Sequence, residues 1–198
     1  VDKRQQMAKI HYMFGGQAPF PLVFRASTGG GRSAAAQHSQ SPHPMFMNLA
    51  GLKLIMPSTP YDAKGLMKSA IRDNNPVLYF EHKRAYNLIR GEVPDGDFTV
   101  PIGAAVVRRP GSDISLISYG LSVHDCLEAA ETMDSEGVSC EVVDLRTVRP
   151  MDHETLLDSA RKTGKVLVVH EDTKAGGIGA EVAAVVSEHA FEHLELFR

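Results

Sequence analysis

Short apolar segments alternate with helical segments along most of this chain, and this alternation restricts its fold more than any other feature. The expected strands cover residues 21–25, 52–56, 77–81, 113–120, 139–145 and 165–170. The expected helices cover residues 3–14, 58–72, 122–136, 152–162 and 179–189, with Ser58 as the expected N-cap of the second. Strand–helix–strand alternation predicts an α/β fold in which helices cover mainly parallel sheets.

Residues 83–112 interrupt the alternation with an extended connection that is rich in glycine and proline. A connection of this length inside one domain is unusual, so we place a domain boundary here. We expect one α/β domain in residues 1–95, a linker in residues 96–111 and a second α/β domain in residues 112–198, each built as three α/β/α layers. The chain begins without Met inside an expected helix, which favours a fragment of a longer protein.

The bulk composition excludes several classes of protein. A formal net charge of −3 does not favour binding to nucleic acid or to an anionic membrane surface. No apolar run approaches the roughly 20 residues that a membrane-spanning helix needs. Cys126 and Cys140 fit neither a metal nor a redox spacing, so we expect two buried thiols in a reducing compartment.

The polar segment Gln37-His38-Ser39-Gln40-Ser41-Pro42 is the strongest candidate for a functional site. It follows a glycine-rich loop, and each of its polar groups would need a partner if the segment were buried. His38 therefore reads as an acid, a base or an anion-positioning group, although a structural role stays open. His43 lies between two prolines, where packing is the simpler interpretation.

Other motifs leave two interpretations open. Gly29-Gly30-Gly31 is either a tight turn or a place where the backbone approaches a ligand. Gly176-Gly177-Ile178-Gly179 is either a helix start or a phosphate-binding turn, although the spacing is not that of a dinucleotide motif. Asp73-Asn74-Asn75-Pro76 either ends a helix or offers oxygens to a hard cation.

Two more groups of polar residues lie near the ends of expected strands. His170-Glu171-Asp172 follows a strand of the second domain, where open α/β sheets bind ligands, but ordinary surface polarity explains it equally well. Four arginines are also candidates for anion binding, with solvated surface charges as the alternative. They are Arg25, Arg32, Arg146 and Arg149.

Six motifs in a fixed order carry a family resemblance. They are Gln37-His38-Ser39-Gln40, Gly51-Leu52-Lys53, Asp62-Ala63-Lys64-Gly65-Leu66, Ile71-Arg72-Asp73-Asn74-Asn75-Pro76, Asp144-Leu145-Arg146-Thr147 with Arg149-Pro150, and Gly176-Gly177-Ile178-Gly179-Ala180-Glu181. Together they resemble the beta subunits of thiamine-diphosphate-dependent 2-oxo acid dehydrogenases. The resemblance covers essentially the whole chain. It implies the second half of a transketolase-like pyrimidine-binding domain followed by most of a transketolase C-terminal-like domain.

The resemblance implies an enzyme that works only as part of an assembly. The expected activity is oxidative decarboxylation of a 2-oxo acid and transfer of the acyl group to the lipoamide of an acyltransferase core. The expected partner is an alpha subunit in an alpha2beta2 heterotetramer, which holds the diphosphate of thiamine diphosphate and its Mg2+. The glutamate that activates the pyrimidine belongs to a part of the family's domain that this sequence lacks. The compartment is the cytoplasm in a bacterium or the mitochondrial matrix in a eukaryote.

The resemblance also assigns residues. His38 matches the active-site histidine that stabilises or protonates intermediates and assists transfer to lipoamide. A structural potassium ion is implied at positions Leu22, Val23, Ala70, Asp73 and Asn75. Ser41-Pro42 and Glu81-His82-Lys83 are closer to the branched-chain or acetoin type than to the pyruvate type. One alternative is a non-catalytic structural or docking fragment. The other is a different transketolase-like enzyme, such as acetoin dehydrogenase, deoxyxylulose-phosphate synthase or transketolase itself.

Overall fold

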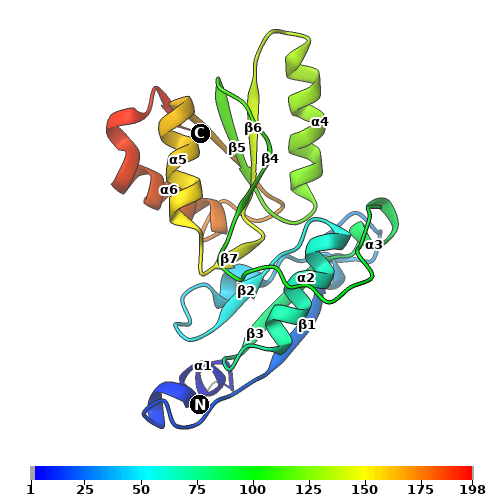
Figure 1. Cartoon of the computed structure of the whole chain (residues 1–198), viewed down its shortest axis with the longest axis vertical. Coiled ribbons are helices and arrows are strands. Elements are labelled where there is room, and N and C mark those ends of the chain that lie inside the picture. Colours follow the sequence, from blue (N-terminus) through cyan, green and yellow to red (C-terminus); the bar gives the residue numbers. More distant parts are fainter. Residues whose placement is uncertain (1–2, 198) are drawn as a thin grey trace. The chain divides into compact units, whose positions relative to one another are not determined.

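The computed structural model describes residues 3–197, and the chain divides into two units (Figure 1). The first unit holds the chain up to Gly103 together with Thr147–Pro150. The second unit holds Ala104–Arg146 and the chain from Met151 onward. The segment 96–111, expected as a linker, contributes to both units. Phe98, Val100 and Ile102 pack on the core of the first unit, whereas Val106–Arg109 form a strand of the second.

A four-stranded sheet organises the first unit. Its order is β1 (Val23–Thr28), β3 (Val77–His82), β2 (Lys53–Ile55) and β7 (Thr147–Arg149). β1, β2 and β3 are parallel, and Val77 lies opposite both Val23 and Lys53. β7 runs antiparallel to β2 and forms one edge of the sheet. The carboxyl ends of the three parallel strands therefore lie along the same edge.

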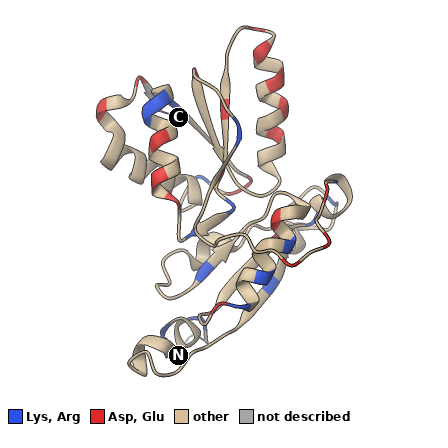
Figure 2. Cartoon of the chain, viewed as in Figure 1, with Lys and Arg blue, Asp and Glu red and all other residues tan. Residues whose placement is uncertain are grey.

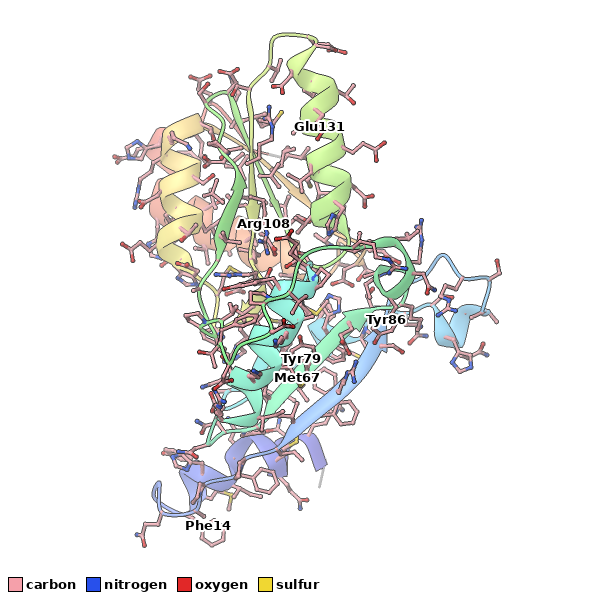
Figure 3. All side chains as sticks on the ribbon, turned by 45° about the vertical axis from the view of Figure 1, so that its right-hand side comes forward. Phe14, Met67, Tyr79, Tyr86, Arg108 and Glu131 are labelled. Carbon is pink, nitrogen blue, oxygen red and sulfur yellow. The ribbon has the colours of Figure 1, made fainter. Side chains whose placement is uncertain are left out.

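Helix α2 (Pro60–Ile71) covers one face of this sheet. Thr59, and not Ser58, is its N-cap, because the Thr59 hydroxyl accepts the N–H of Asp62 at 3.1 Å. The Tyr79 hydroxyl of β3 donates to the Ala63 carbonyl at 2.8 Å, which ties strand to helix. Met67 of α2 packs against the buried cluster that contains Tyr79 (Figure 3).

Shorter elements complete the first unit. Phe80 meets the rings of His43 and Phe46 at centroid distances of 6.0 and 5.9 Å. The remaining helices are α1 (Lys3–Met13), η1 (Ala36–His38), η2 (His43–Phe46) and α3 (Ala85–Leu88), of which η1 and η2 are 3₁₀ helices. The Lys9 ammonium of α1 donates to the Ala50 carbonyl at 2.9 Å.

A five-stranded sheet organises the second unit. Its order is β4 (Val106–Arg109), β6 (Cys140–Asp144), β5 (Ile114–Ser118), β8 (Lys165–Val169) and β9 (Leu196–Phe197). All pairs are parallel except β4 with β6. The order in which strands are added reverses between β5 and β8, because β6 lies on one side of β5 and β8 lies on the other.

Helices cover both faces of the second sheet (Figure 1). α4 (Ser122–Asp134) lies on one face, and α5 (His153–Thr163) and α6 (Ile178–Ala190) lie on the other. The short 3₁₀ helix η3 (Phe191–His193) follows α6. Acidic residues recur along α4 (Figure 2). The expected α/β fold with two mainly parallel sheets and flanking helices is confirmed. In the described residues, no helix combines the length and the apolar character that crossing a membrane requires.

Candidate functional site

The loop after β1 is closed at its base by hydrogen bonds. The Gly29 N–H and the Thr28 hydroxyl both donate to the Gln40 carbonyl, at 3.0 and 3.1 Å. Residues 30–39 therefore project as one closed loop from the carboxyl edge of the parallel strands. This edge is where α/β sheets present ligand-binding residues.

His38 lies at the end of η1 within this loop, and its side chain is exposed. The Lys83 ammonium holds the backbone beneath it, since it donates to the carbonyls of both His38 and Gly29, the latter at 3.3 Å. The Ser39 hydroxyl donates to the Ala35 carbonyl at 2.8 Å. An imidazole that is exposed on a fixed backbone can exchange protons with a bound molecule.

Backbone geometry around His38 is unusual for ordinary residues. Ser33 and Ala35 both adopt positive φ angles, of 53° and 60°. Non-glycine residues rarely adopt this region, and such residues cluster at functional sites. Sequence reasoning did not predict these conformations, because small residues such as Ser and Ala carry no signal for them.

Glycine is required at two positions of the loop by neighbouring side chains. A Cβ on Gly29 would lie 1.9 Å from Nε2 of His82, and a Cβ on Gly31 would lie 2.7 Å from Cδ of Arg84. Nδ1 of the buried His82 accepts the Arg84 N–H at 3.2 Å. These contacts favour the tight-turn interpretation of the glycines. They also show that His82 and Lys83 hold the loop in place. The Glu81-His82-Lys83 sequence is the signal that could have identified them.

His43 does not join His38. Its side chain is 2% exposed and packs beside Phe80, which agrees with the packing interpretation. Pro44 lies in the first turn of η2, where the missing N–H costs nothing.

A cavity of about 200 Å3 opens at the same edge of the first sheet. It lies between the start of α2 and α3, and it is lined by residues that include Ser58, Thr59, Glu81, His82 and Tyr86. The Glu81 carboxylate accepts hydrogen bonds from Arg25 and from the Tyr86 hydroxyl, the latter at 3.1 Å. Burial raises the pKa of Tyr86, so its hydroxyl keeps the proton it donates.

The five positions expected to hold potassium lie in two segments, residues 22–23 around the start of β1 and residues 70–75 around the end of α2. Val77 N–H donates to the Leu22 carbonyl at 2.8 Å, and β1 begins at Val23 beside it. The Ala70 carbonyl, at the end of α2, accepts the Asp73 N–H at 3.3 Å.

The Asp73 carboxylate is already engaged. One oxygen accepts the Lys53 ammonium and the other accepts the Asn75 N–H at 2.8 Å. Burial alone would raise the pKa of Asp73, but the hydrogen bonds from Lys53 and Asn75 outweigh it and lower that pKa. Within residues 3–197, no group of three His, Cys, Asp or Glu side chains could hold a metal, so any cation here would depend on carbonyl oxygens.

Three of the four candidate arginines have structural partners. Arg25 forms an ion pair with Glu81, and Arg149 donates to the Met47 carbonyl. Arg146 donates to the carbonyls of Ala104 and Ala105 at 2.9 and 3.0 Å. For these three, a structural role replaces the anion-binding interpretation. Arg32 is exposed on the glycine loop.

Close contacts surround two glycines at the carboxyl end of β8 in the second sheet. A Cβ on Gly179 would lie 2.4 Å from Nε2 of His170, and a Cβ on Gly177 would lie 2.1 Å from the Thr173 carbonyl oxygen. The His170 ring stacks on Tyr119 at 6.0 Å, and burial lowers the pKa of His170. The glycines of 176–179 are thus explained by the start of α6, and a phosphate turn is not needed.

Comparison with known proteins places both units. Residues 2–88 match the transketolase pyrimidine binding domain, and residues 103–196 match the transketolase C-terminal domain. The chain is 56% identical over 190 residues to 2-oxoisovalerate dehydrogenase subunit beta of Bacillus subtilis (strain 168), covering 96% of this chain and 58% of that protein.

Two further relatives are similar over the same 190 residues and 96% of this chain. Acetoin:2,6-dichlorophenolindophenol oxidoreductase subunit beta of Cupriavidus necator is 50% identical, with 56% of its length covered. Pyruvate dehydrogenase E1 component subunit beta of Bacillus subtilis (strain 168) is 45% identical, with 58% covered. The chain therefore spans less than two thirds of the length of these relatives.

A solved structure shares the fold. It is described as a split gene transketolase in an inactive beta4 tetramer. It superimposes with a TM-score of 0.74 at 26% sequence identity, over 93% of this chain and 60% of that one.

Proposed function

Because the chain belongs to the transketolase family, with its pyrimidine-binding domain followed by its C-terminal domain, we propose that it acts as the beta subunit of a 2-oxo acid dehydrogenase. The resemblance expected from the six ordered motifs is confirmed by relatives of that type. The observation that carries the proposal is the exposed His38 imidazole on a loop that Lys83 fixes.

The substrate that similarity favours is a branched-chain 2-oxo acid. Identity is 56% to a 2-oxoisovalerate dehydrogenase beta subunit and 45% to a pyruvate dehydrogenase beta subunit. The acetoin type lies between them at 50% and is the runner-up. This order supports the interpretation of Ser41-Pro42 and Glu81-His82-Lys83 as branched-chain or acetoin features.

His38 is the catalytic residue of the proposal. Thiamine diphosphate, when bound, supplies the nucleophile and the electron sink for decarboxylation. The chain contributes an exposed imidazole that can give or take a proton beside the reacting group, and assist acyl transfer to lipoamide. Glu81, the acidic residue at this edge, is held by Arg25 and Tyr86. The pyrimidine-activating glutamate must therefore come from elsewhere, and we assign the diphosphate and its Mg2+ to an alpha subunit.

A structural potassium ion is a second part of the proposal. Leu22, Val23, Ala70, Asp73 and Asn75 would supply it with oxygens. The Leu22 carbonyl accepts one backbone N–H and keeps a second lone pair for a cation. The Ala70 carbonyl, by contrast, already accepts the N–H groups of Arg72 and Asp73 and would have to exchange one of them. Such a site would join the end of α2 to the start of β1.

The assembly proposed is an alpha2beta2 heterotetramer that delivers acyl groups to a lipoyl acyltransferase core. The related split gene transketolase is described as a beta4 tetramer, which supports an oligomeric state for chains of this fold. The compartment would be the bacterial cytoplasm, or the mitochondrial matrix in a eukaryote.

Replacement of His38 tests the function in the assembled complex. We expect His38→Ala to reduce the turnover of 2-oxoisovalerate by about 10²–10⁴-fold, the usual contribution of a general acid–base group. His189→Ala removes an exposed histidine of α6 and serves as the control. Near-normal turnover of the His38 variant would remove its catalytic assignment.

A non-catalytic docking role is the second candidate, because Glu81, which lines the cavity at the carboxyl edge of the first sheet, is already held by Arg25 and Tyr86. The chain alone would then show no decarboxylation with added thiamine diphosphate but would still bind an alpha subunit. Measurable turnover by the chain alone would contradict the docking role. Co-purification with an alpha subunit, followed by comparison of pyruvate, 2-oxoisovalerate and acetoin, would then separate the substrate classes.

A further inference from the structure

Arg32 lies on the loop that carries His38 and Arg84 follows β3, and both differ from the other arginines at this edge of the sheet. Arg25 is neutralised by Glu81, and Arg149 donates to a carbonyl. For Arg32 and Arg84, by contrast, the described part of the chain contains no ion pair between either guanidinium group and a carboxylate. Both side chains are exposed.

The two arginines line one small cavity. It has a volume of about 150 Å3, and its other lining residues are Asn87 and Leu88. Two guanidinium groups and a carboxamide offer only hydrogen-bond donors and one amide oxygen, a set that matches the oxygens of a carboxylate or phosphate. The volume suits one such group rather than a large ligand.

The glycine loop positions Arg84 for this role. Gly31 has φ +78°, and a Cβ there would lie 2.7 Å from Cδ and 3.3 Å from Nη1 of Arg84. The side chain of Arg84 therefore runs along the loop backbone only because residue 31 is glycine. The Arg84 backbone is fixed as well, since its N–H donates to His82.

The local charge around the cavity is positive. Lys83 adds a third cation, and its ammonium group contacts the carbonyls of Gly29 and His38. Glu81 does not cancel this charge, because its carboxylate is bound by Arg25 and Tyr86. Positive charge without a neighbouring counterion attracts anions to a site and concentrates them there.

We propose that Arg32, Arg84 and Asn87 form a binding site for an oxyanion group of a small ligand, next to the loop that carries His38. Under the function proposed above, the source of that group is the carboxylate of a 2-oxo acid, and this identification rests on that function. A phosphorylated ligand shares the chemistry and is the other source. The site itself requires only the cavity and its unneutralised guanidinium groups.

Calorimetric titration of the full chain at low salt tests the site without any turnover. The probes are 2-oxoisovalerate, inorganic phosphate and the uncharged isobutyramide. We expect saturable binding of an oxyanion that weakens as salt is added, and no binding of isobutyramide. The tighter of the two anions identifies the source. Absence of saturable binding by both anions, or equal binding of isobutyramide, would overturn the proposal.

Paired variants place the binding on these residues. We expect Arg32→Gln with Arg84→Gln to weaken oxyanion binding about tenfold or more, as loss of charge-assisted hydrogen bonds requires. Arg90→Gln removes one positive charge from an exposed arginine outside the cavity and should leave the affinity within about twofold. Equal affinity in the double variant and the wild type would overturn the proposal. Since turnover is not measured, that outcome would leave the His38 test of the proposed function unaffected.

Discussion

At the scale of single residues, buried charged groups mark the positions where substitution should destabilise this chain. The Asp144 side chain is 0% exposed, and Arg108 donates to it from Nε and Nη2 at 3.0 and 2.8 Å. The second oxygen of Asp144 accepts the N–H of Arg146 at 2.9 Å, which stabilises the positive φ of 56° at Arg146. Asp144 and Arg146 of the Asp144-Leu145-Arg146-Thr147 motif thus have a structural explanation in the second unit.

Removal of Arg108 should be costly. We expect Arg108→Met to lower the free energy of unfolding by about 3–5 kcal/mol, because it removes one partner of a buried ion pair and both of its hydrogen bonds to Asp144. Arg161 forms exposed contacts, a 3.5 Å pair with Asp158 and a 3.2 Å hydrogen bond to the His189 carbonyl, so Arg161→Met should cost less than about 1 kcal/mol. Urea denaturation of both variants measures the difference. Equal losses in the two variants would contradict this account of Asp144.

Asp73 predicts a dependence of stability on acid. Burial raises the pKa of Asp73, whereas the hydrogen bonds from Lys53 and Asn75 lower it. The hydrogen bonds have the larger effect, so the pKa in the folded state is lower than the ordinary value of about 3.9. Its stabilising contribution is therefore present above about pH 4 and is lost as the pH falls through the folded pKa. Asp73→Asn should reduce the loss of stability between about pH 5 and pH 3.

Thermal unfolding at a series of pH values measures this effect. Asp158→Asn removes an exposed carboxylate and serves as the matched control. An unchanged acid dependence in Asp73→Asn would show that the Lys53–Asp73 pair does not contribute.

At the scale of elements, long periodic segments were predictable and so was the short strand β2, whereas the short strands β4 and β7 were not. Helices 122–136 and 179–189 correspond to α4 and α6, and strand 77–81 corresponds to β3, within two residues at each end. β7 has three residues and was not predicted, because it pairs with β2 through a contact that is distant in sequence. β4 was hidden by the glycines and prolines around it. Periodicity needs more residues than such strands contain.

The loop of the candidate site could be predicted from the sequence, but the contacts that hold this loop in place could not. The polar composition around His38 identified the loop, and the exposure of His38 agrees with it. The contacts of His82 and Lys83 join positions more than forty residues away, at Gly29 and His38, and such pairs carry no local pattern. The partners of Arg25 and Arg149 were missed for the same reason.

Lys83 should control the order of the loop rather than the stability of the unit. We expect Lys83→Met to speed amide hydrogen exchange in residues 30–40 while the unfolding midpoint falls by a small amount, because the two carbonyls that its ammonium holds both belong to this loop or its base. Lys83→Arg keeps a cationic donor and should restore part of the protection. Lys64→Met removes another lysine that contacts a carbonyl, that of Pro94, and is the control. Unchanged exchange in the loop would contradict a positioning role.

At the scale of the whole molecule, the first unit is not continuous in sequence. Thr147–Pro150 belong to it, although they follow three strands of the second unit, β4, β5 and β6. The Thr147 hydroxyl accepts the Gly103 N–H at 2.9 Å, and Arg149 reaches the Met47 carbonyl. A chain that ended at residue 103 would lack β7, and one side of the β2 backbone would then have no strand partner. Domain boundaries drawn along the sequence do not describe this arrangement.

The other edge of the first sheet predicts association. β1 pairs only with β3 in the described residues, so one side of its backbone is unpaired, and Phe24 on it is 51% exposed. Tyr12, Met13 and Phe14 are also exposed in this unit. Unpaired edges with apolar side chains favour pairing with another chain.

Light scattering of the chain without partners should therefore show mass that increases with protein concentration. Phe24→Lys places a charge on the edge strand and should shift the population towards monomer. Met45→Lys, at a side chain that is 60% exposed on η2 rather than on a strand edge, should leave the association unchanged. A monomer at every concentration would contradict association through β1, and equal effects of the two substitutions would assign it to exposed apolar surface in general.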